Sequence, residues 1–349
     1  KKYKEVSDLK ALTQEELFED EKGILTEFFK TLIDKNYTLL IGWNTDEFDV
    51  PVLFKRLERH LGNNSFLDTV ERQRCRFLDA YVCFRKTRSG LWSSWKLDDV
   101  ANKIYGAGKL FKLSEKGLLT LTPDEMQAYT IIDADLVRHI DLLEPHFSGD
   151  PIPPEKVKEI LEKQETRLTD YYVELAAFSN IFPDETTQST KVADGLLLRK
   201  AREHNYVLPN KPQIDPKVKI IPIKGARVMD PQPGVHELVA NLDFSSLYPN
   251  IIIFWKISPD KEGLIYPELL KELIAKRKEN KNLYEKTKLV VYNTRQQALK
   301  ILANALYGAF IYPKFRLFDR AKGEQVTLHG RELISMVKDF VEEILKYLV

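Results

Sequence analysis

Residues 235–250 read VHELVANLDFSSLYPN and join an apolar run to an acid and a serine pair. The pattern of residues 235–242 predicts a β-strand, so that Asp243 would stand at a strand end. An aspartate in such a position is most often a helix cap or a turn residue. Here Ser245 and Ser246 follow it, in a predicted strand-to-helix turn of the kind whose backbone N–H groups bind phosphate oxygens. The segment therefore predicts a metal ion on Asp243 beside a polyphosphate.

Lys300, Asn304 and Tyr307 are predicted to share one face of a later helix. The apolar pattern of residues 290–307 is helical. Positions i, i+4 and i+7 fall within about 60° of one another at 3.6 residues per turn. A cation, an amide and an aromatic ring would therefore form one stripe.

A second predicted helix, residues 267–283, places Arg277 and Lys281 one turn apart. Residues 267–300 contain nine Lys and Arg against four Asp and Glu. Such a basic segment is most often a solvated helix face. The alternative is that its cations neutralise the charge of a bound polyphosphate.

The order and spacing of these segments resemble those of family B DNA polymerases of the archaeal type. Residues 243–250 are similar to the family's first polymerase motif, DxxSLYPS, and residues 300–308 are similar to its KxxxNSxYG motif. Residues 223–226 stand where the family often has YxGG. The resemblance implies template-directed DNA synthesis, in which two metal ions assist the transfer of a nucleotide from a dNTP to the primer 3′ hydroxyl.

The same resemblance assigns roles to individual residues. Asp243 would bind the two Mg²⁺ ions, with Mn²⁺ as an alternative, and the carbonyl of Phe244 would assist. Tyr248 would form the floor of the sugar pocket and exclude a 2′ hydroxyl. Gly225 and Gly308 would contact DNA. The residues assigned to the incoming nucleotide are Ser245, Ser246, Leu247, Tyr248, Arg277, Lys281, Lys300, Asn304 and Tyr307.

A second acidic segment, residues 44–53, reads NTDEFDVPVL and follows a predicted strand. Three acids in four residues usually form a solvated turn, but Asp49 precedes an apolar run and is expected at the start of a packed helix. The segment is similar to the family's second exonuclease motif, NxxxFDxPxL. The resemblance implies DNA contacts for Asn44 and Phe48 and a metal-binding role for Asp49.

Tyr129 and Asp133 resemble the family's third exonuclease motif, YxxxD. Spaced i and i+4 on a helix, a tyrosine hydroxyl and a carboxylate can reach one metal-bound water. The resemblance makes Asp133 a second metal ligand of a 3′–5′ proofreading site and makes Tyr129 the residue that orients the attacking water. Residues 97–100 resemble the family's segment between these two motifs. Asp135, two residues after Asp133, is better explained as an exposed helix charge.

The composition is that of a globular protein with more than one domain. The 349 residues are 43% hydrophobic and 30% charged, which excludes disorder, collagen and coiled-coil arrays. No apolar run approaches the roughly 18 residues of a membrane helix, and neither a signal peptide nor membrane association is expected. Cys75 and Cys83 are too few for a disulfide framework. The net charge of +1 gives no global preference for a polyanion.

The predicted fold class is a multidomain combination of α/β and α+β. Helix and strand patterns alternate over residues 1–150, which the resemblance makes a ribonuclease H-like exonuclease domain, and the prolines of residues 148–154 mark a boundary. The resemblance implies a polymerase palm over 151–260, helical fingers over 261–308 and a return to the palm over 309–349. The other predicted helices are 21–35, 97–105, one from 122, 157–178 and 330–348, and the other predicted strands are 37–42, 76–84 and three short strands within 205–234.

Two family motifs are not found in the sequence. Nothing before Tyr37 matches the first exonuclease motif, DxE, and the DTDS motif with the second polymerase aspartate would come after the helix expected over residues 330–348. The family's amino-terminal domain and thumb are not matched either. Asp243 alone cannot hold two metals. We therefore expect polymerase activity only with a second polypeptide or a further carboxyl-terminal segment that carries the last motif and the thumb.

Three interpretations from different classes remain open. The first, which we favour, is the large part of a replicative or repair DNA polymerase with proofreading. It would act in the cytoplasm at the nucleoid, on primer–template DNA and dNTPs, with a sliding clamp as a further partner. The second is a catalytically silent, polymerase-like DNA-binding subunit. This interpretation does not explain why the chain has Asp243, Lys300 and Asn304. The third is a stand-alone ribonuclease H-like nuclease, which the motifs after residue 240 disfavour.

Overall fold

The protein is described by a computed structural model that covers two compact units. The first unit contains the residues up to Val173 together with Phe182–Thr187, and the second contains Glu174–Ile181 and the residues from Gln188 onward. The residues that the structure describes are 21–62, 75–88, 92–106, 108, 120–164, 166–213, 225–230, 233–235, 237, 239, 241–260 and 263–348. The proline-rich turn at 148–154 lies within the first unit, and the assignment of palm and fingers to residue ranges stays a prediction.

The first unit contains a two-stranded parallel sheet. Strand β1 (Leu39–Gly42) pairs with β2 (Arg76–Asp79), and Gly42 stands opposite Asp79. The carboxyl ends of both strands therefore meet at one edge. Helices α2 (Glu21–Asp34) and α3 (Asp49–Leu61) pack together beside the sheet. Their core contains Leu25, Phe29, Leu32, Leu57 and Cys75.

Further helices complete this unit. α7 packs against α6, α8 and β1. It starts at a capping box in which Thr122 and Glu125 each satisfy the backbone N–H of the other, which confirms the predicted start. The elements are α5 (Ala80–Thr87), α6 (Leu97–Tyr105), α7 (Pro123–Leu143), η2 (Glu144–His146), α8 (Pro154–Lys163), the first part of α9 (Leu168–Ser179) and η3 (Pro183–Thr187).

Two predicted elements of this unit were partly wrong. The strand predicted over residues 76–84 ends at Asp79, because the Asp79 carboxylate accepts the backbone N–H of Tyr81 and caps α5. The helix predicted over 157–178 is two helices, since α8 ends at Gln164 in the left-handed conformation. Both cysteines are free and buried.

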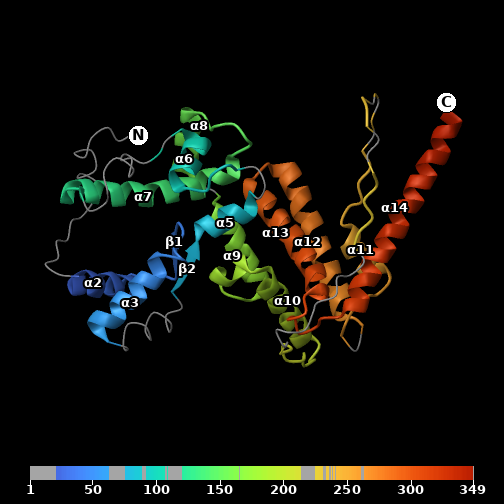
Figure 1. The fold of residues 1–349 in the computed structure, drawn as a ribbon, viewed down its shortest axis with the longest axis horizontal. Coiled ribbons are helices and arrows are strands. Elements are labelled where there is room, and N and C mark those ends of the chain that lie inside the picture. The colour runs from blue at the N-terminus through green and yellow to red at the C-terminus, as the bar shows by residue number, and fades with distance from the viewer. Residues whose placement is uncertain are drawn as a thin grey trace. The chain divides into compact units, whose positions relative to one another are not determined.

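The second unit is helical in its described residues. α12 (Ile265–Thr287) and α13 (Val290–Ile311) form a hairpin, with Lys288 in the left-handed conformation at the turn (Figure 1). Their shared core contains Leu269, Leu270, Leu273, Leu299, Leu302 and Leu306. Three further helices pack around the hairpin, namely α10 (Ser189–Glu203), α11 (Leu247–Phe254) and α14 (Arg320–Leu348).

The strand predicted before Asp243 is not formed by the described residues of 235–242. Val235 is 98% exposed and Val239 is also largely exposed. A strand needs a hydrogen-bonded neighbour, and the described residues contain one sheet, which is formed by β1 and β2. Residues 205–213 and 225–230 also contain no strand, and most other residues of that predicted strand region lie outside the described ranges.

In the described part of the chain, no helix combines the length and the apolar character that a membrane span requires.

Candidate nucleotide-binding site

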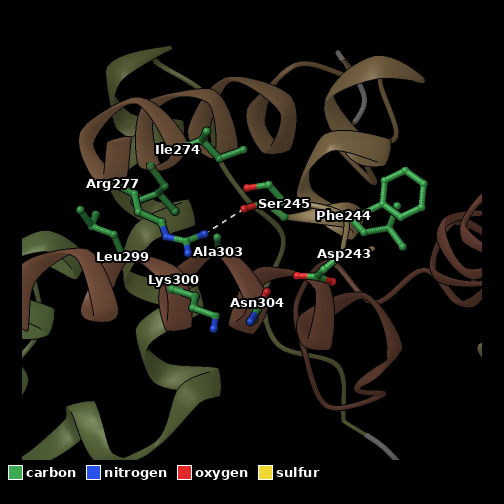
Figure 2. Close-up of a pocket in the computed structure, with 12 residues that line it drawn as sticks. Asp243, Phe244, Ser245, Ile274, Arg277, Leu299, Lys300, Ala303 and Asn304 are labelled. Atoms are coloured by element: carbon green, nitrogen blue, oxygen red, sulfur yellow. Dashed lines mark hydrogen bonds between the residues drawn. The ribbon is translucent and has the colours of Figure 1, made fainter. Parts of the chain in front are cut away.

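A cavity of about 310 Å³ opens beside the amino-terminal end of α11 in the second unit. We call it the Asp243 pocket. Figure 2 shows the polar ends of Asp243, Arg277, Lys300 and Asn304 around this cavity. The lining residues are Asp243, Phe244, Ser245, Ser246, Leu247, Leu273, Ile274, Arg277, Leu299, Lys300, Ala303 and Asn304.

The turn before α11 has a fixed shape. Ser246 has φ 55° and ψ 50°, in the left-handed region that non-glycine residues seldom adopt. The backbone N–H of Asn250 donates to the Ser246 carbonyl at 3.0 Å, and the Asn250 side chain donates to the Ser245 carbonyl at 2.9 Å. These bonds place the serine pair at the helix start, as predicted, although the strand expected before the pair is not formed.

Helix α12 brings Arg277 to this turn. The Arg277 guanidinium donates a 3.0 Å hydrogen bond to the Ser246 hydroxyl, drawn as a dashed line in Figure 2. The first half of α12 is held against α10 by an ion pair of Arg199 with Glu272 at 3.3 Å and by a hydrogen bond of 2.8 Å between His204 and Glu268. Arg277 therefore extends from an anchored helix into the pocket.

Helix α13 supplies the other cation of the pocket. Lys300 and Asn304 are exposed and line the cavity, whereas Leu299 and Ala303 beside them are buried in the helix core. The helical period thus brings Lys300 and Asn304 to one face, as predicted.

Tyr307, the third residue of the predicted stripe, packs on Tyr248 of α11. Their ring centroids lie 4.6 Å apart at 48°, and burial together with the neighbouring Tyr248 raises the pKa of Tyr307 to about 12. Gly330 of α14 comes so close that a Cβ there would be 3.2 Å from Tyr248 Cε1. Tyr248 is therefore held between two helices next to the pocket.

Five sequence-predicted residues of the second unit do not line the Asp243 pocket, namely Tyr248, Tyr307, Lys281, Gly225 and Gly308. The Lys281 ammonium lies 3.9 Å from Glu285, one turn further along α12 than Arg277. Gly225 accepts a 3.4 Å hydrogen bond from Arg331 at its carbonyl. Gly308 is exposed on α13. The DNA contacts predicted for both glycines stay predictions.

The oxygen donors near Asp243 fit part of a magnesium site. Mg²⁺ prefers oxygen ligands, and the Asp243 carboxylate and the Phe244 carbonyl are of that kind. Of the described residues lining the pocket, Asp243 is the one acid. The described ranges contain no group of three Asp, Glu, His or Cys side chains able to hold a metal ion. The donors therefore suit one partly coordinated ion.

Asp49 and Asp133, two of the predicted exonuclease residues, both lie in the first unit. Asp49 is the exposed first residue of α3, and Asp133 is half-buried on α7. Burial raises the pKa of Asp49, and the negative charges of Asp79 and Asp133 raise it further. Of these causes, the charge of Asp133 has the smallest effect.

The other predicted exonuclease residues lie on α7 and in the segment before α3. Tyr129 is half-buried one turn before Asp133 on α7. Asn44 has φ 63°, and Phe48 is 64% exposed immediately before α3. Asp135 lies 3.7 Å from both Arg138 and His139, as expected for a helix charge, although it is half-buried and not exposed.

Comparison with known proteins identifies the family. A model of DNA polymerase family B matches residues 185–261 and 256–348, and a model of the exonuclease domain of family B matches residues 1–100. Together the two models match well over half of the chain. The chain belongs to DNA polymerase family B.

This family B chain is similar to archaeal polymerases. It is 27% identical over 374 residues to a DNA polymerase of Pyrococcus glycovorans and 29% identical over 378 residues to DNA polymerase 1 of Pyrococcus abyssi. Both alignments cover 94% of this chain and 45% of the relative. The chain therefore spans less than half the length of these relatives.

A solved structure shares the fold of this family B chain. The family B DNA polymerase of the hyperthermophilic archaeon Pyrobaculum calidifontis matches with a TM-score of 0.64 and 20% identity, over 95% of this chain and 46% of that one. The resemblance found in the sequence is thus confirmed at the level of family and fold.

Sequence reasoning missed several residues around the two sites of this family B chain. Leu273, Ile274, Leu299 and Ala303 line the Asp243 pocket but look like ordinary core positions in the sequence. Asp79 was also missed, because it lies within the strand predicted over residues 76–84, whereas β2 ends at this residue.

Proposed function

We propose that this chain supplies the dNTP-binding site of a template-directed DNA polymerase. The observation that carries the proposal is the convergence of Asp243, Arg277, Lys300 and Asn304 on one cavity from three separate segments. One carboxylate facing two cations and an amide suits a metal-bound triphosphate. A solvated helix face would not require this arrangement, because its charges would point to open water.

Each polar group of the pocket has a role in this proposal. Arg277 and Lys300 neutralise phosphate charge. Asn304 donates to a phosphate oxygen, and the backbone N–H groups at the start of α11 contribute the positive end of the helix dipole. Tyr248, held against Tyr307, forms the floor under the sugar.

Asp243 and the Phe244 carbonyl would hold a divalent ion, Mg²⁺ or Mn²⁺, that accompanies the triphosphate. When bound, such an ion stabilises negative charge that develops during phosphoryl transfer. These residues do not select the base of the incoming nucleotide. That selection would come from pairing with the template strand, while the protein contacts the DNA backbone.

Primer extension is proposed for this chain together with the parts of the polymerase that it does not span. The curated relatives are more than twice as long as their alignment to this chain. We infer that the last polymerase motif and the thumb come from a further segment or a second polypeptide. Primer–template DNA, dNTPs and a sliding clamp are the proposed partners, at the nucleoid in the cytoplasm.

A second proposed function is 3′–5′ exonuclease proofreading in the first unit. The observation that favours it is the match of residues 1–100 to the exonuclease domain of family B, together with the position of Asp49 at the start of α3, where Asp79 and, more weakly, Asp133 add negative charge. A like charge that raises a carboxylate pKa is a frequent property of metal-dependent hydrolytic sites.

The polymerase proposal is tested by primer extension with the complete polypeptide or complex that contains this chain. Asp243→Ala is expected to abolish Mg²⁺-dependent extension, while Asp135→Asn in the first unit leaves it intact. Undiminished extension by Asp243→Ala would remove the Asp243 pocket from the polymerase site.

A further inference from the structure

Asp79 is an acid that neither proposed activity uses, and it is almost completely buried. Its side chain is 2% exposed, at the last position of β2 and opposite Gly42, the last residue of β1. A buried carboxylate is costly unless hydrogen bonds stabilise it. The position at the carboxyl edge of a parallel sheet is also where strands deliver functional side chains in α/β folds.

The Asp79 carboxylate accepts three backbone hydrogen bonds. Oδ1 accepts from the N–H of Asn44 at 2.9 Å and from the N–H of Tyr81 at 2.9 Å, and Oδ2 accepts from the N–H of Asp46 at 3.2 Å. The bond from Tyr81 caps α5. The other two bonds reach across to the segment between β1 and α3, so a single side chain organises two chain segments.

The segment that Asp79 holds has an unusual backbone. Asn44 has φ 63°, a conformation that persists when its surroundings fix it. A Cβ at Gly42 would collide with the Thr45 side chain, so only glycine allows Thr45 to pack there. The N–H of Val50 donates to the Thr45 carbonyl at 2.9 Å and ties the turn to the first turn of α3.

The turn held in this way carries the candidate residues of the exonuclease site. Asn44 lies within it, and Phe48 and Asp49 follow it, both exposed. We propose that Asp79 is a positioning residue whose carboxylate fixes the turn of residues 44–46, so that Asn44, Phe48 and Asp49 are presented together to the 3′ end of a DNA strand. This inference rests on the proposed exonuclease function of the first unit.

Two variants separate this role from simple capping of α5. Asp79→Asn keeps an oxygen for the N–H groups of Asn44 and Tyr81, but its amide nitrogen cannot accept from the N–H of Asp46. Asp79→Ser keeps a good helix cap and removes the second carboxylate oxygen. Asp141→Asn is the matched control, because Asp141 is another buried acid with two hydrogen bonds, both from Thr169.

The experiment measures two quantities on the intact chain. The first is amide hydrogen exchange at residues 44, 46 and 81, and the second is binding of a fluorescein-labelled single-stranded oligonucleotide with a free 3′ hydroxyl. In Asp79→Asn we expect exchange at Asp46 to accelerate about tenfold with Tyr81 unchanged. We expect oligonucleotide affinity to fall about five- to tenfold at a temperature well below the melting temperatures of both the wild type and the variant. Asp79→Ser should reduce the oligonucleotide affinity by the same factor, and Asp141→Asn should leave it unchanged.

The outcomes distinguish the inference from the function on which it rests. Wild-type chain that fails to bind the oligonucleotide would contradict the exonuclease proposal and, with it, a DNA-presenting role for Asp79. Wild-type binding with unchanged affinity in both Asp79 variants would overturn the positioning role alone. A loss of affinity that is seen only at temperatures where the variants begin to unfold would show that Asp79 acts as a structural cap alone.

Discussion

Arg277 on α12 donates a 3.0 Å hydrogen bond to the hydroxyl of Ser246, the residue that precedes α11 in the left-handed conformation. The bond links the α12–α13 hairpin to the turn that carries Asp243. A long arginine side chain loses conformational freedom when it binds a ligand, and holding it beforehand lowers that cost. Ser246 is therefore expected to act on nucleotide binding through Arg277.

A double-mutant cycle tests the link between Ser246 and Arg277. Ser246→Ala is expected to raise the dNTP dissociation constant about three- to tenfold, and Arg277→Ala about ten- to 100-fold, in line with a hydrogen bond to a charged group. The double variant should lose little more than Arg277→Ala alone, because the bond is already broken. Titration calorimetry of all four proteins measures the coupling. Fully additive effects would show that the two residues act independently.

Lys300 is expected to bind the nucleotide and not the DNA backbone. Lys300→Ala should weaken dNTP binding on the order of ten- to 100-fold, the cost of one charge-assisted phosphate contact, and change primer–template affinity less than about threefold. Fluorescence titrations of both ligands measure the two effects. Equal losses would place Lys300 on DNA phosphates.

Lys281→Ala is the comparison for Lys300→Ala. The family resemblance assigns both lysines to the triphosphate, but of the two only Lys300 lines the pocket. We expect Lys281→Ala to change dNTP affinity less than about twofold, as for an exposed surface charge. A loss as large as that of Lys300→Ala would show that the triphosphate extends past the described cavity.

Tyr248 is expected to select the sugar. Its ring packs against Tyr307 and lies beside Gly330, so it cannot move away from a 2′ hydroxyl without disturbing two helices. In Tyr248→Ala, the ratio of rNTP to dNTP dissociation constants should fall toward one, from a value of about ten or more. Tyr248→Phe keeps the ring and should keep the ratio. Competition binding measures it, and an unchanged ratio in Tyr248→Ala would exclude this role.

Asp141 is expected to make the first unit less stable as the pH rises from 4 to 6. Burial raises the pKa of Asp141 from 3.8 to about 6, against the opposing effect of its bonds from Thr169. Between these values the folded chain holds a proton that the unfolded chain has lost, so the stabilisation is complete below pH 3.8 and is lost as the pH rises through 6. The shift corresponds to about 3 kcal/mol.

Asp141→Asn can keep both contacts with Thr169 without a charge. Urea denaturation from pH 4 to 7 should show a smaller fall in unfolding free energy for this variant than for the wild type, and greater stability at pH 7. Glu155→Gln changes an exposed acid and should follow the wild-type profile. Parallel profiles for Asp141→Asn and the wild type would contradict the assignment.

The helices were largely predictable from the sequence, and the strands before Asp243 were not. α6 begins and ends at the predicted residues, with Gly106 in the left-handed conformation after its last turn. α7 begins at its capping box, where local side chains determine the limit. A strand depends on a partner elsewhere in the chain. The residues of 235–242 that the structure describes lack such a partner, although their pattern favours extended structure.

The pocket was predictable where helical spacing determined it. Lys300 and Asn304 share a face because residues four apart on a helix always do. The same rule places Arg277 and Lys281 on one face of α12. It does not predict where the cavity ends, and Lys281 lies one turn beyond the lining residue Arg277. The hydrogen bond from Arg277 to Ser246 depends on how α12 packs against α11, which no local pattern contains.

The most direct test of the nucleotide site is a dNTP titration of this chain with and without Mg²⁺, repeated for Asp243→Ala and Lys300→Ala. We predict that Mg²⁺ strengthens binding to the wild type and has little effect on Asp243→Ala, while Lys300→Ala is weakened under both conditions. Wild-type affinity and an unchanged response to Mg²⁺ in both variants would contradict the assignment of the Asp243 pocket to the nucleotide.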